Sequence, residues 1–321
     1  MVNANAIKKV FEASLKLRKE ESCLIVTDTL KKDIGEAFYE AAKKITRKAK
    51  VIVIKPTAEH GAEPSEKAAS EMLNYDVEIL VTDRSLTHTS ARREASKRGA
   101  RIATMPSITE EIANRCLDVD YENMRERSAY LYKILSAAKS VHMTTEFGTD
   151  ITFKVGKGKF FGDNGGILDF PGAYGNLPEG EIAFGPETCE GVYVVDTSFA
   201  DCGILKSPLS FRVRGGVVVE IDGAGSKALM ERLDKAGARA YKVAELGIGL
   251  NKKAIITGNI LEDEKVIGTA HVAVGNNTSF GGTNDVQLHL DGVINKPDIT
   301  VDGVKLMERG RFLDEKMPPV K

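Results

Sequence analysis

The sequence predicts an α/β protein in two parts: a Rossmann-like α/β domain over residues 1–140, and a mixed α+β domain with a largely antiparallel sheet over residues 141–321. Three observations favour this organisation. In the first part, short and continuously apolar runs alternate with helical patterns, which is typical of a parallel sheet covered on both faces. After residue 140 the chain becomes rich in Gly, β-branched residues and short alternating runs. The length of 321 residues is also enough for two ordinary domains.

The elements of the first part follow from hydrophobic spacing. Apolar residues at helical spacing predict helices, and short apolar runs bounded by Pro or Gly predict strands. The expected helices cover residues 6–17, 34–45, 64–73 and 90–97. The expected strands cover residues 23–26, 51–54, 77–81 and 101–104. No G-x-G-x-x-G follows the first strand and no Walker A run occurs in the sequence, so a nucleotide site is not expected.

The second part reads as hairpins and one helix. Residues 144–155 carry a turn signal at Phe147-Gly148-Thr149-Asp150, and residues 211–221 carry another at Gly215-Gly216. A strand is expected over residues 192–198 and a helix over residues 225–236. These elements predict a sheet in which neighbouring strands run antiparallel.

Composition excludes several classes of partner. The formal net charge is −1, without the basic stripe that nucleic acid demands, and no run of about 18 apolar residues is present to cross a membrane. The N-terminus is amphipathic rather than signal-like, so we expect a cytoplasmic protein. In that compartment we expect the four cysteines, which form no C-x-x-C pair, to be reduced. The sequence has no Trp and only one Gln, and it is rich in Lys and Glu. This composition favours a thermophilic source.

Candidate metal ligands gather in three Gly-rich stretches, residues 175–182, 244–251 and 268–292. His289 and Asp291 stand two residues apart, which places both side chains on one face of a strand. His271 lies on the preceding apolar run. Imidazole and carboxylate together suit Zn, Fe, Mn or Co, whereas a single buried His is more often a satisfied core residue.

Two glutamates complete the candidate set. Glu245 lies inside a strongly apolar run, where a buried carboxylate needs a partner that a metal would supply. Glu181 precedes another apolar strand. The alternative for both is a side chain that points to solvent at a sheet edge. The acidic run 262–264 reads as a solvated loop cluster, although one of its members has a small chance of bonding to a ligand His. The remaining histidines, for which no partner set is evident, are read as structural or surface residues: His60, His88 and His142.

At these stretches the sequence resembles the thermophilic metallo-aminopeptidases of the aminopeptidase T type. The shared motifs are N-L-P-x-G-E, A-E-L-G-I-G-x-N, D-E-K-x-x-G-T-x-H-x-A-x-G and H-x-D, and they cover residues 170–310 closely. The resemblance implies a homodimer and two divalent metal ions, Zn, Co or Mn. The motifs carry the metal ligands over to Glu181, Glu245, His271, His289 and Asp291. A tyrosine ligand of the family does not carry over, because Thr278 stands at its position.

This resemblance makes a metal-dependent aminopeptidase the first expectation. A metal-activated water would attack the peptide bond, and Glu181 or Glu245 would act as the catalytic proton shuttle. The substrate would then be a peptide, or another small molecule.

Two alternatives remain open. The sequence resembles, more distantly, the dihydroxypyridine dioxygenases, which share the H…H-x-D frame but use a single Fe(II) to open an aromatic ring. In that resemblance a serine joins the ligands, and Ser279 is the candidate. The third possibility is a metal-binding relative without catalytic activity.

Overall fold

The computed structural model describes residues 2–320, and these form two compact units. The first unit comprises the chain up to Arg125 together with Asn164–Glu179. The second comprises Glu126–Asp163 together with the chain from Gly180 onwards. Helix α6 (Tyr121–Ala137) contains the first of these divisions.

The first unit is built on a five-stranded parallel sheet with the strand order β2-β1-β3-β4-β7. The parallel sheet expected from the apolar runs is therefore confirmed. The strands are β1 (Ser22–Asp28), β2 (Lys48–Ile54), β3 (Val77–Val81), β4 (Arg101–Thr104) and β7 (Tyr174–Asn176). The helical segments are α1 (Ala4–Lys9), the π-helical turn η1 (Val10–Ser14), α2 (Lys32–Ile45), α3 (Glu66–Met72), α4 (Ser90–Lys97) and α5 (Glu110–Cys116).

Local sequence signals explain where these helices begin. Ser65, Thr89 and Thr109 each cap a helix by accepting a hydrogen bond from a backbone N–H in the first turn. Strands β3 and β4 are buried at every position, as expected for a parallel sheet covered on both faces, whereas β2 is mostly half-buried. Strand β7 differs from these strands, since its three residues Tyr174–Asn176 carry no apolar run.

The second unit is dominated by one large antiparallel sheet of 13 strands. Its main path runs β10-β9-β15-β14-β13-β8-β6-β5-β16-β17-β18, and the hairpin of β11 and β12 joins it through β8. The first strands are β5 (Ser140–Thr144), β6 (Asp150–Phe161), β8 (Glu181–Val195), β9 (Ser198–Phe199), β10 (Gly203–Ile204), β11 (Leu209–Arg214) and β12 (Val217–Asp222). The later strands are β13 (Val243–Gly249), β14 (Thr269–Gly275), β15 (His289–Asn295), β16 (Asp298–Val301), β17 (Val304–Glu308) and β18 (Arg311–Phe312).

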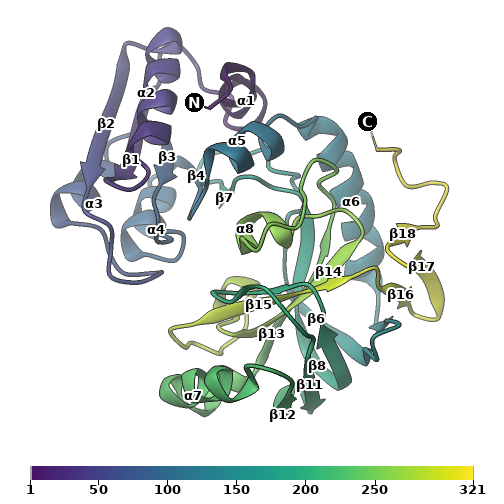
Figure 1. Ribbon diagram of the computed structural model, residues 1–321. Coiled ribbons are helices and arrows are strands. Elements are labelled where there is room, and N and C mark those ends of the chain that lie inside the picture. Colours follow the sequence, from purple (N-terminus) through teal and green to yellow (C-terminus); the bar gives the residue numbers. More distant parts are fainter. Residues whose placement is uncertain (1, 321) are drawn as a thin grey trace. The chain divides into compact units, whose positions relative to one another are not determined.

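Both expected hairpins and the expected helix of this unit are confirmed. Strands β5 and β6 pair antiparallel with Thr144 opposite Asp150, and β11 and β12 turn at Gly215-Gly216. The helix is α7 (Ser226–Ala236), followed by the 3₁₀ turn η2 (Ala238–Tyr241); the short segments α8 (Ile260–Asp263) and η3 (Thr278–Phe280) come later in the chain. In Figure 1, β13, β14 and β15 lie side by side near the middle of this sheet.

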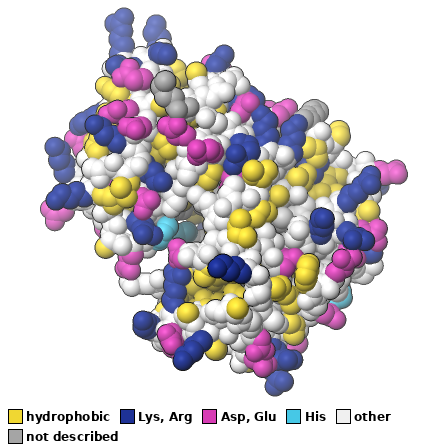
Figure 2. All heavy atoms as spheres, viewed as in Figure 1, with side chains coloured by type: hydrophobic (Ala, Val, Ile, Leu, Met, Phe, Trp, Pro, Cys, Tyr) yellow, Lys and Arg dark blue, Asp and Glu magenta, His cyan; other side chains and the backbone are white. Residues whose placement is uncertain are grey.

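The surface shown in Figure 2 carries Lys, Arg, Asp and Glu side chains intermixed rather than in blocks of one sign. Within residues 2–320, none of the helices combines the length and apolar character that crossing a bilayer requires.

Candidate metal centre

Four neighbouring strands of the antiparallel sheet bring the five candidate ligands together. Glu181 opens β8, Glu245 lies on β13, His271 lies on β14, and His289 and Asp291 lie on β15. In the sheet these strands follow one another as β15-β14-β13-β8. The residues are far apart in sequence, and the strand order makes them neighbours.

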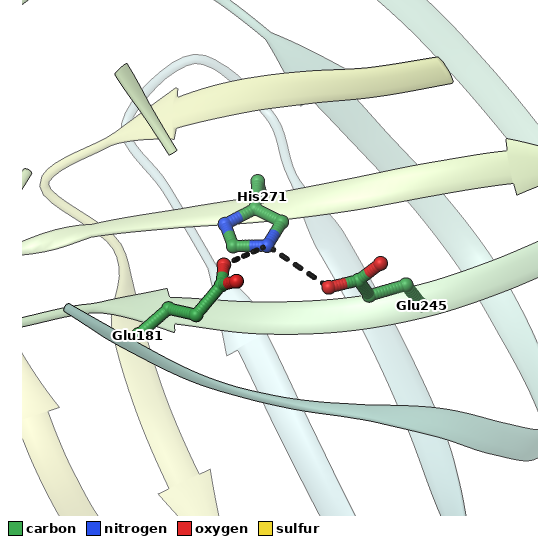
Figure 3. A group of neighbouring side chains, drawn as sticks. All are labelled: Glu181, Glu245 and His271. Carbon is green, nitrogen blue, oxygen red and sulfur yellow. Dashed lines mark hydrogen bonds and ion pairs between the residues drawn. The ribbon is translucent and has the colours of Figure 1, made fainter. Parts of the chain in front are cut away.

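His271 lies between the two glutamates. Its Nε2 atom is 3.1 Å from Oε2 of Glu181 and 3.2 Å from Oε1 of Glu245. Figure 3 shows both carboxylates directed at this one ring nitrogen. The His271 side chain is fully buried, so these carboxylates and the imidazole meet away from bulk water.

Glu245 links this group to the residues of β15. Its second oxygen, Oε2, is 2.8 Å from Nε2 of His289, and that nitrogen is 3.5 Å from Oδ1 of Asp291. The single carboxylate of Glu245 therefore contacts both imidazoles. The sequence placed His289 and Asp291 on one strand face, and the structure brings their side chains together.

Glu264 and Lys265 also belong to the centre, and sequence reasoning did not identify them as site residues. Nζ of Lys265 is 2.6 Å from Oε1 of Glu181 and 2.5 Å from Oε1 of Glu264. Ligand atoms of Glu264, His271 and Asp291 all lie within 4.8 Å of one another. The sequence signal that could have identified them is the D-E-K stretch (residues 263–265), which lies shortly before His271 in the same motif.

The expectation that residues 262–264 form a solvated cluster is wrong, because all three acidic side chains are buried. Glu262 accepts a hydrogen bond from the backbone N–H of Ile255, and Asp263 accepts from those of Thr257 and Gly258. The preceding loop thus supplies hydrogen-bond donors to two of the three carboxyl groups. The third, Glu264, accepts a hydrogen bond from Nζ of Lys265.

Opposing effects set the ionisation of the two glutamates. Burial alone would raise the pKa of Glu181, but the Lys265 ammonium and His271 outweigh it and lower that pKa to about 2. Burial likewise opposes ionisation of Glu245, and hydrogen bonds with His271 and His289 lower its pKa to about 2. Both groups are therefore carboxylates at neutral pH and offer anionic oxygens to a cation.

The other groups of the centre respond to the same crowding of charge. Burial, with smaller contributions from nearby carboxylates, raises the pKa of Glu264 to about 8 although Lys265 opposes the shift. Burial would lower the pKa of His271 and His289, yet the adjoining carboxylates hold both well above the usual value. The anionic oxygens thus favour positive charge on, or next to, each of the two imidazoles.

Contacts behind His289 orient its ring. Nδ1 lies 2.8 Å from the backbone oxygen of Asn276, so the Nδ1 proton is donated there and Nε2 faces Glu245 and Asp291. The Phe280 ring stacks on the imidazole at a centroid separation of 6.4 Å. His289 thereby presents one defined nitrogen to the centre.

Two motif glycines make room for this arrangement. Gly247 is paired directly with His271 across β13 and β14. A Cβ atom at residue 247 would lie 2.1 Å from Nε2 of His271, far inside van der Waals contact. Gly180, with a φ of 137°, lets Asn251 approach to a distance at which a Cβ would meet the Asn251 Cβ at 2.5 Å. Only glycine at these positions leaves the imidazole and the start of β8 where they are.

The donor set fits a divalent metal ion. Two ligand atoms bound to one ion at about 2.1 Å and at right angles lie about 3.0 Å apart, and the contacts among the imidazole nitrogens and carboxylate oxygens here span 2.8 to 3.5 Å. Among the residues that the structure describes, Oδ1 of Asp291 and Oε2 of Glu181 are buried and accept no well-aligned hydrogen bond. A metal would satisfy both oxygens.

The remaining candidates lie elsewhere or stay predictions. His142 is exposed on β5 and contacts Asp150 at 2.8 Å. Thr278, at the position of the family's tyrosine, is an exposed residue of η3. Ser279 belongs to the same short turn, next to Phe280, and its role as a ligand stays a prediction.

Comparison with known proteins identifies relatives of the whole chain. The family model described as "NicX: 2,5-dihydroxypyridine 5,6-dioxygenase" matches residues 3–314. The structure of 2,5-dihydroxypyridine dioxygenase from Pseudomonas putida KT2440 is similar with a TM-score of 0.86 and 18% sequence identity, and the match covers 98% of this chain and 97% of that one. Wild-type AmpT from Thermus thermophilus is similar with a TM-score of 0.68 and 17% identity, covering 97% and 99% of the two chains. A search of curated protein sequences found no match.

Both resemblances read from the sequence are confirmed by these similarities in fold. At identities of 17% and 18% the structural matches speak for the fold alone. The family model carries more weight, because it matches the sequence over nearly its full length.

Proposed function

The chain belongs to the 2,5-dihydroxypyridine 5,6-dioxygenase family, and from this premise we propose that it is an Fe(II)-dependent dioxygenase that opens the ring of a dihydroxylated pyridine. The family match is supported by the greater similarity to the dioxygenase structure, with a TM-score of 0.86 against 0.68 for AmpT.

The first expectation from the sequence, a metallo-aminopeptidase, is wrong. The family model that covers residues 3–314 is that of a dioxygenase, and AmpT is the weaker of the two structural matches. Of the motifs that suggested a peptidase, the H…H-x-D frame is also part of the resemblance to the dioxygenases. The dioxygenase alternative, which rested on the H…H-x-D frame and on Ser279 as a candidate ligand, is the better supported one.

One observation carries the proposal: two imidazoles contact the same carboxylate, and a further carboxylate lies beside one of them. His271 and His289 contact the same carboxylate, Glu245, and Asp291 lies 3.5 Å from His289. Two histidines and one carboxylate with open positions are the ligand set typical of non-haem Fe(II) oxygenases. His271, His289 and Asp291 are accordingly the proposed iron ligands, with Glu245 and Glu181 beside them.

When bound, Fe(II) would supply the one-electron chemistry with O₂ that an aromatic ring cannot carry out alone. The side chains have separate tasks around it. The backbone oxygen of Asn276 fixes the tautomer of His289. Glu181 and Glu245 balance the charge of a cation, and the burial of His271, Glu245 and Asp291 limits the access of bulk water to it.

The test is oxygen uptake by protein loaded with Fe(II) under anaerobic conditions. With 2,5-dihydroxypyridine, we expect one O₂ consumed for each ring opened, together with loss of the aromatic absorbance. His289→Ala should reduce uptake by at least about 100-fold, whereas His142→Ala, which removes an exposed histidine of the same unit, should behave as the unmodified protein. Metal binding without oxygen uptake on any dihydroxypyridine would refute the proposal and favour the non-catalytic relative.

A further inference from the structure

Lys265 is a lysine with no access to solvent, next to the proposed iron ligands. Its side chain is 1% exposed. A lone ammonium group in such a place would be strongly disfavoured, so its partners determine why it is there.

The backbone on both sides of Lys265 is fixed. Its N–H donates to the carbonyl oxygen of Glu262 at 2.9 Å, and its own carbonyl oxygen accepts from the N–H of Asn251 at 2.8 Å. Residue 266 also forms a bridge with Asn251. The Lys265 side chain therefore starts from a defined point, and the ammonium reaches a defined position.

At that position the ammonium binds one oxygen of the Glu181 carboxylate and leaves the other free to face His271. Nζ donates to Oε1 of Glu181 at 2.6 Å, and this leaves Oε2 facing His271 at 3.1 Å. The second carboxylate held by Nζ is Glu264, at 2.5 Å. Because one oxygen of Glu181 is fixed by Lys265, the carboxylate cannot rotate away from the imidazole without losing a charged hydrogen bond.

The charges of the cluster require such a cation. Four acidic side chains (Glu181, Glu245, Glu264 and Asp291) lie within the buried centre. Without Lys265, Oε1 of Glu181 would lose its nearest positive group, and burial of an uncompensated carboxylate is costly.

We infer that Lys265 is a positioning residue of the iron centre: by holding Oε1 of Glu181, it keeps Oε2 directed at His271, one of the proposed iron ligands. The inference rests on the proposed function, since it requires that the centre binds a metal. Lys265 acts through Glu181 and does not itself contact the metal.

The experiment measures the affinity for Co(II), used as a visible-absorbing probe, by titration of the purified protein and its variants. Lys265→Met should weaken Co(II) binding by about 10- to 100-fold, the usual range for a residue behind a metal ligand. In a Glu181→Gln background the same substitution should have little further effect, because the group through which Lys265 acts has already been changed. Lys305→Met is the matched control, since this exposed lysine of the same unit contacts Glu308 and Asp298.

Each other outcome has a distinct meaning. If Lys265→Met lowers the melting temperature but leaves the affinity for Co(II) unchanged, Lys265 is only structural and the inference is overturned. A loss of equal size in the Glu181→Gln background would also overturn it. If Lys265→Met fails to fold, Lys265→Gln, which keeps a donor without the charge, provides the same comparison. Failure of the unmodified protein to bind Co(II) would instead refute the proposed function.

Discussion

Replacing Gly247 by alanine should disable the metal centre without altering any ligand. Gly247 lies opposite His271 in the β13–β14 ladder, and the new Cβ would be 2.1 Å from Nε2 and 2.2 Å from Cε1 of the imidazole. Ordinary van der Waals contact begins at 3.4 Å. The ring must therefore retreat by about 1.3 Å, the difference between 3.4 and 2.1 Å, or rotate away from Glu181 and Glu245.

That displacement is large for a metal ligand. Ligand distances in metal sites are held to within about 0.2 Å, and a misplacement of about 1 Å typically costs on the order of 100-fold in a precisely arranged site. We therefore expect Gly247→Ala to weaken metal binding by at least about 100-fold. Overpacking should lower the free energy of unfolding by a further ~1–3 kcal/mol in the metal-free protein.

Calorimetric titration with Mn(II) would measure the affinity, and urea unfolding of the metal-free protein would measure the stability separately. Gly156→Ala is the control, because a Cβ there meets nothing nearer than the Cβ of Glu187 at 3.3 Å. It should bind Mn(II) as the unmodified protein does. Unchanged Mn(II) affinity in Gly247→Ala would show that the nitrogen of His271 that faces the two glutamates does not bind the metal.

Three further predictions concern stability and packing. Burial raises the pKa of Glu78, so the folded protein retains a proton that the unfolded chain releases above pH 4.5. Glu78→Gln should therefore stabilise the protein at pH 7 but not at pH 4. An equal gain at both pH values in urea unfolding would contradict this. Hydrogen bonds from Arg101 outweigh burial and lower the pKa of Glu21 to about 2. The ionised Glu21 therefore contributes ~3 kcal/mol to the free energy of unfolding above pH 4.5, and this contribution is lost toward pH 2. The difference in unfolding free energy between Glu21→Gln and the unmodified protein should shrink over that interval, and a constant difference would refute the assignment. Phe280 packs on His289 and Phe161, so Phe280→Ala should lower the free energy of unfolding by ~3 kcal/mol and also weaken metal binding. A loss of thermal stability with unchanged Mn(II) affinity would show that the ring does not orient His289.

Sequence reasoning recovered the elements whose pattern is local. The strands at residues 23–26, 77–81 and 101–104 are short, mostly apolar runs, and the parallel sheet follows from them. Strand β7 (Tyr174–Asn176) could not be found in this way, because three residues of mixed polarity carry no period. Its place beside β4 depends on a segment that returns to the first sheet after β6.

The five candidate ligands were found because each combines a metal-binding side chain with an apolar strand. His289 and Asp291 share a strand face by simple alternation, and Glu245 stood out as a charge in an apolar run. Glu264 and Lys265 were missed, because consecutive charged residues ordinarily indicate a solvated loop. Their burial depends on partners distant in sequence, Glu181 for Lys265 above all.

The choice between two chemistries was beyond the sequence motifs. Both resemblances rest on the H…H-x-D frame, and the chemistry that such a frame supports depends on which metal is bound. The motifs alone favoured the peptidase; the family match over residues 3–314 reversed that order.

The central claim is that His271, His289 and Asp291 hold one Fe(II) ion. The most direct measurement is iron per chain, by elemental analysis, after anaerobic loading with Fe(II) and gel filtration. We expect about one iron per chain in the unmodified protein and almost none in His289→Ala, with the His142→Ala control unaffected. Absence of iron from the unmodified protein, or equal retention by His289→Ala, would contradict the assignment of this centre.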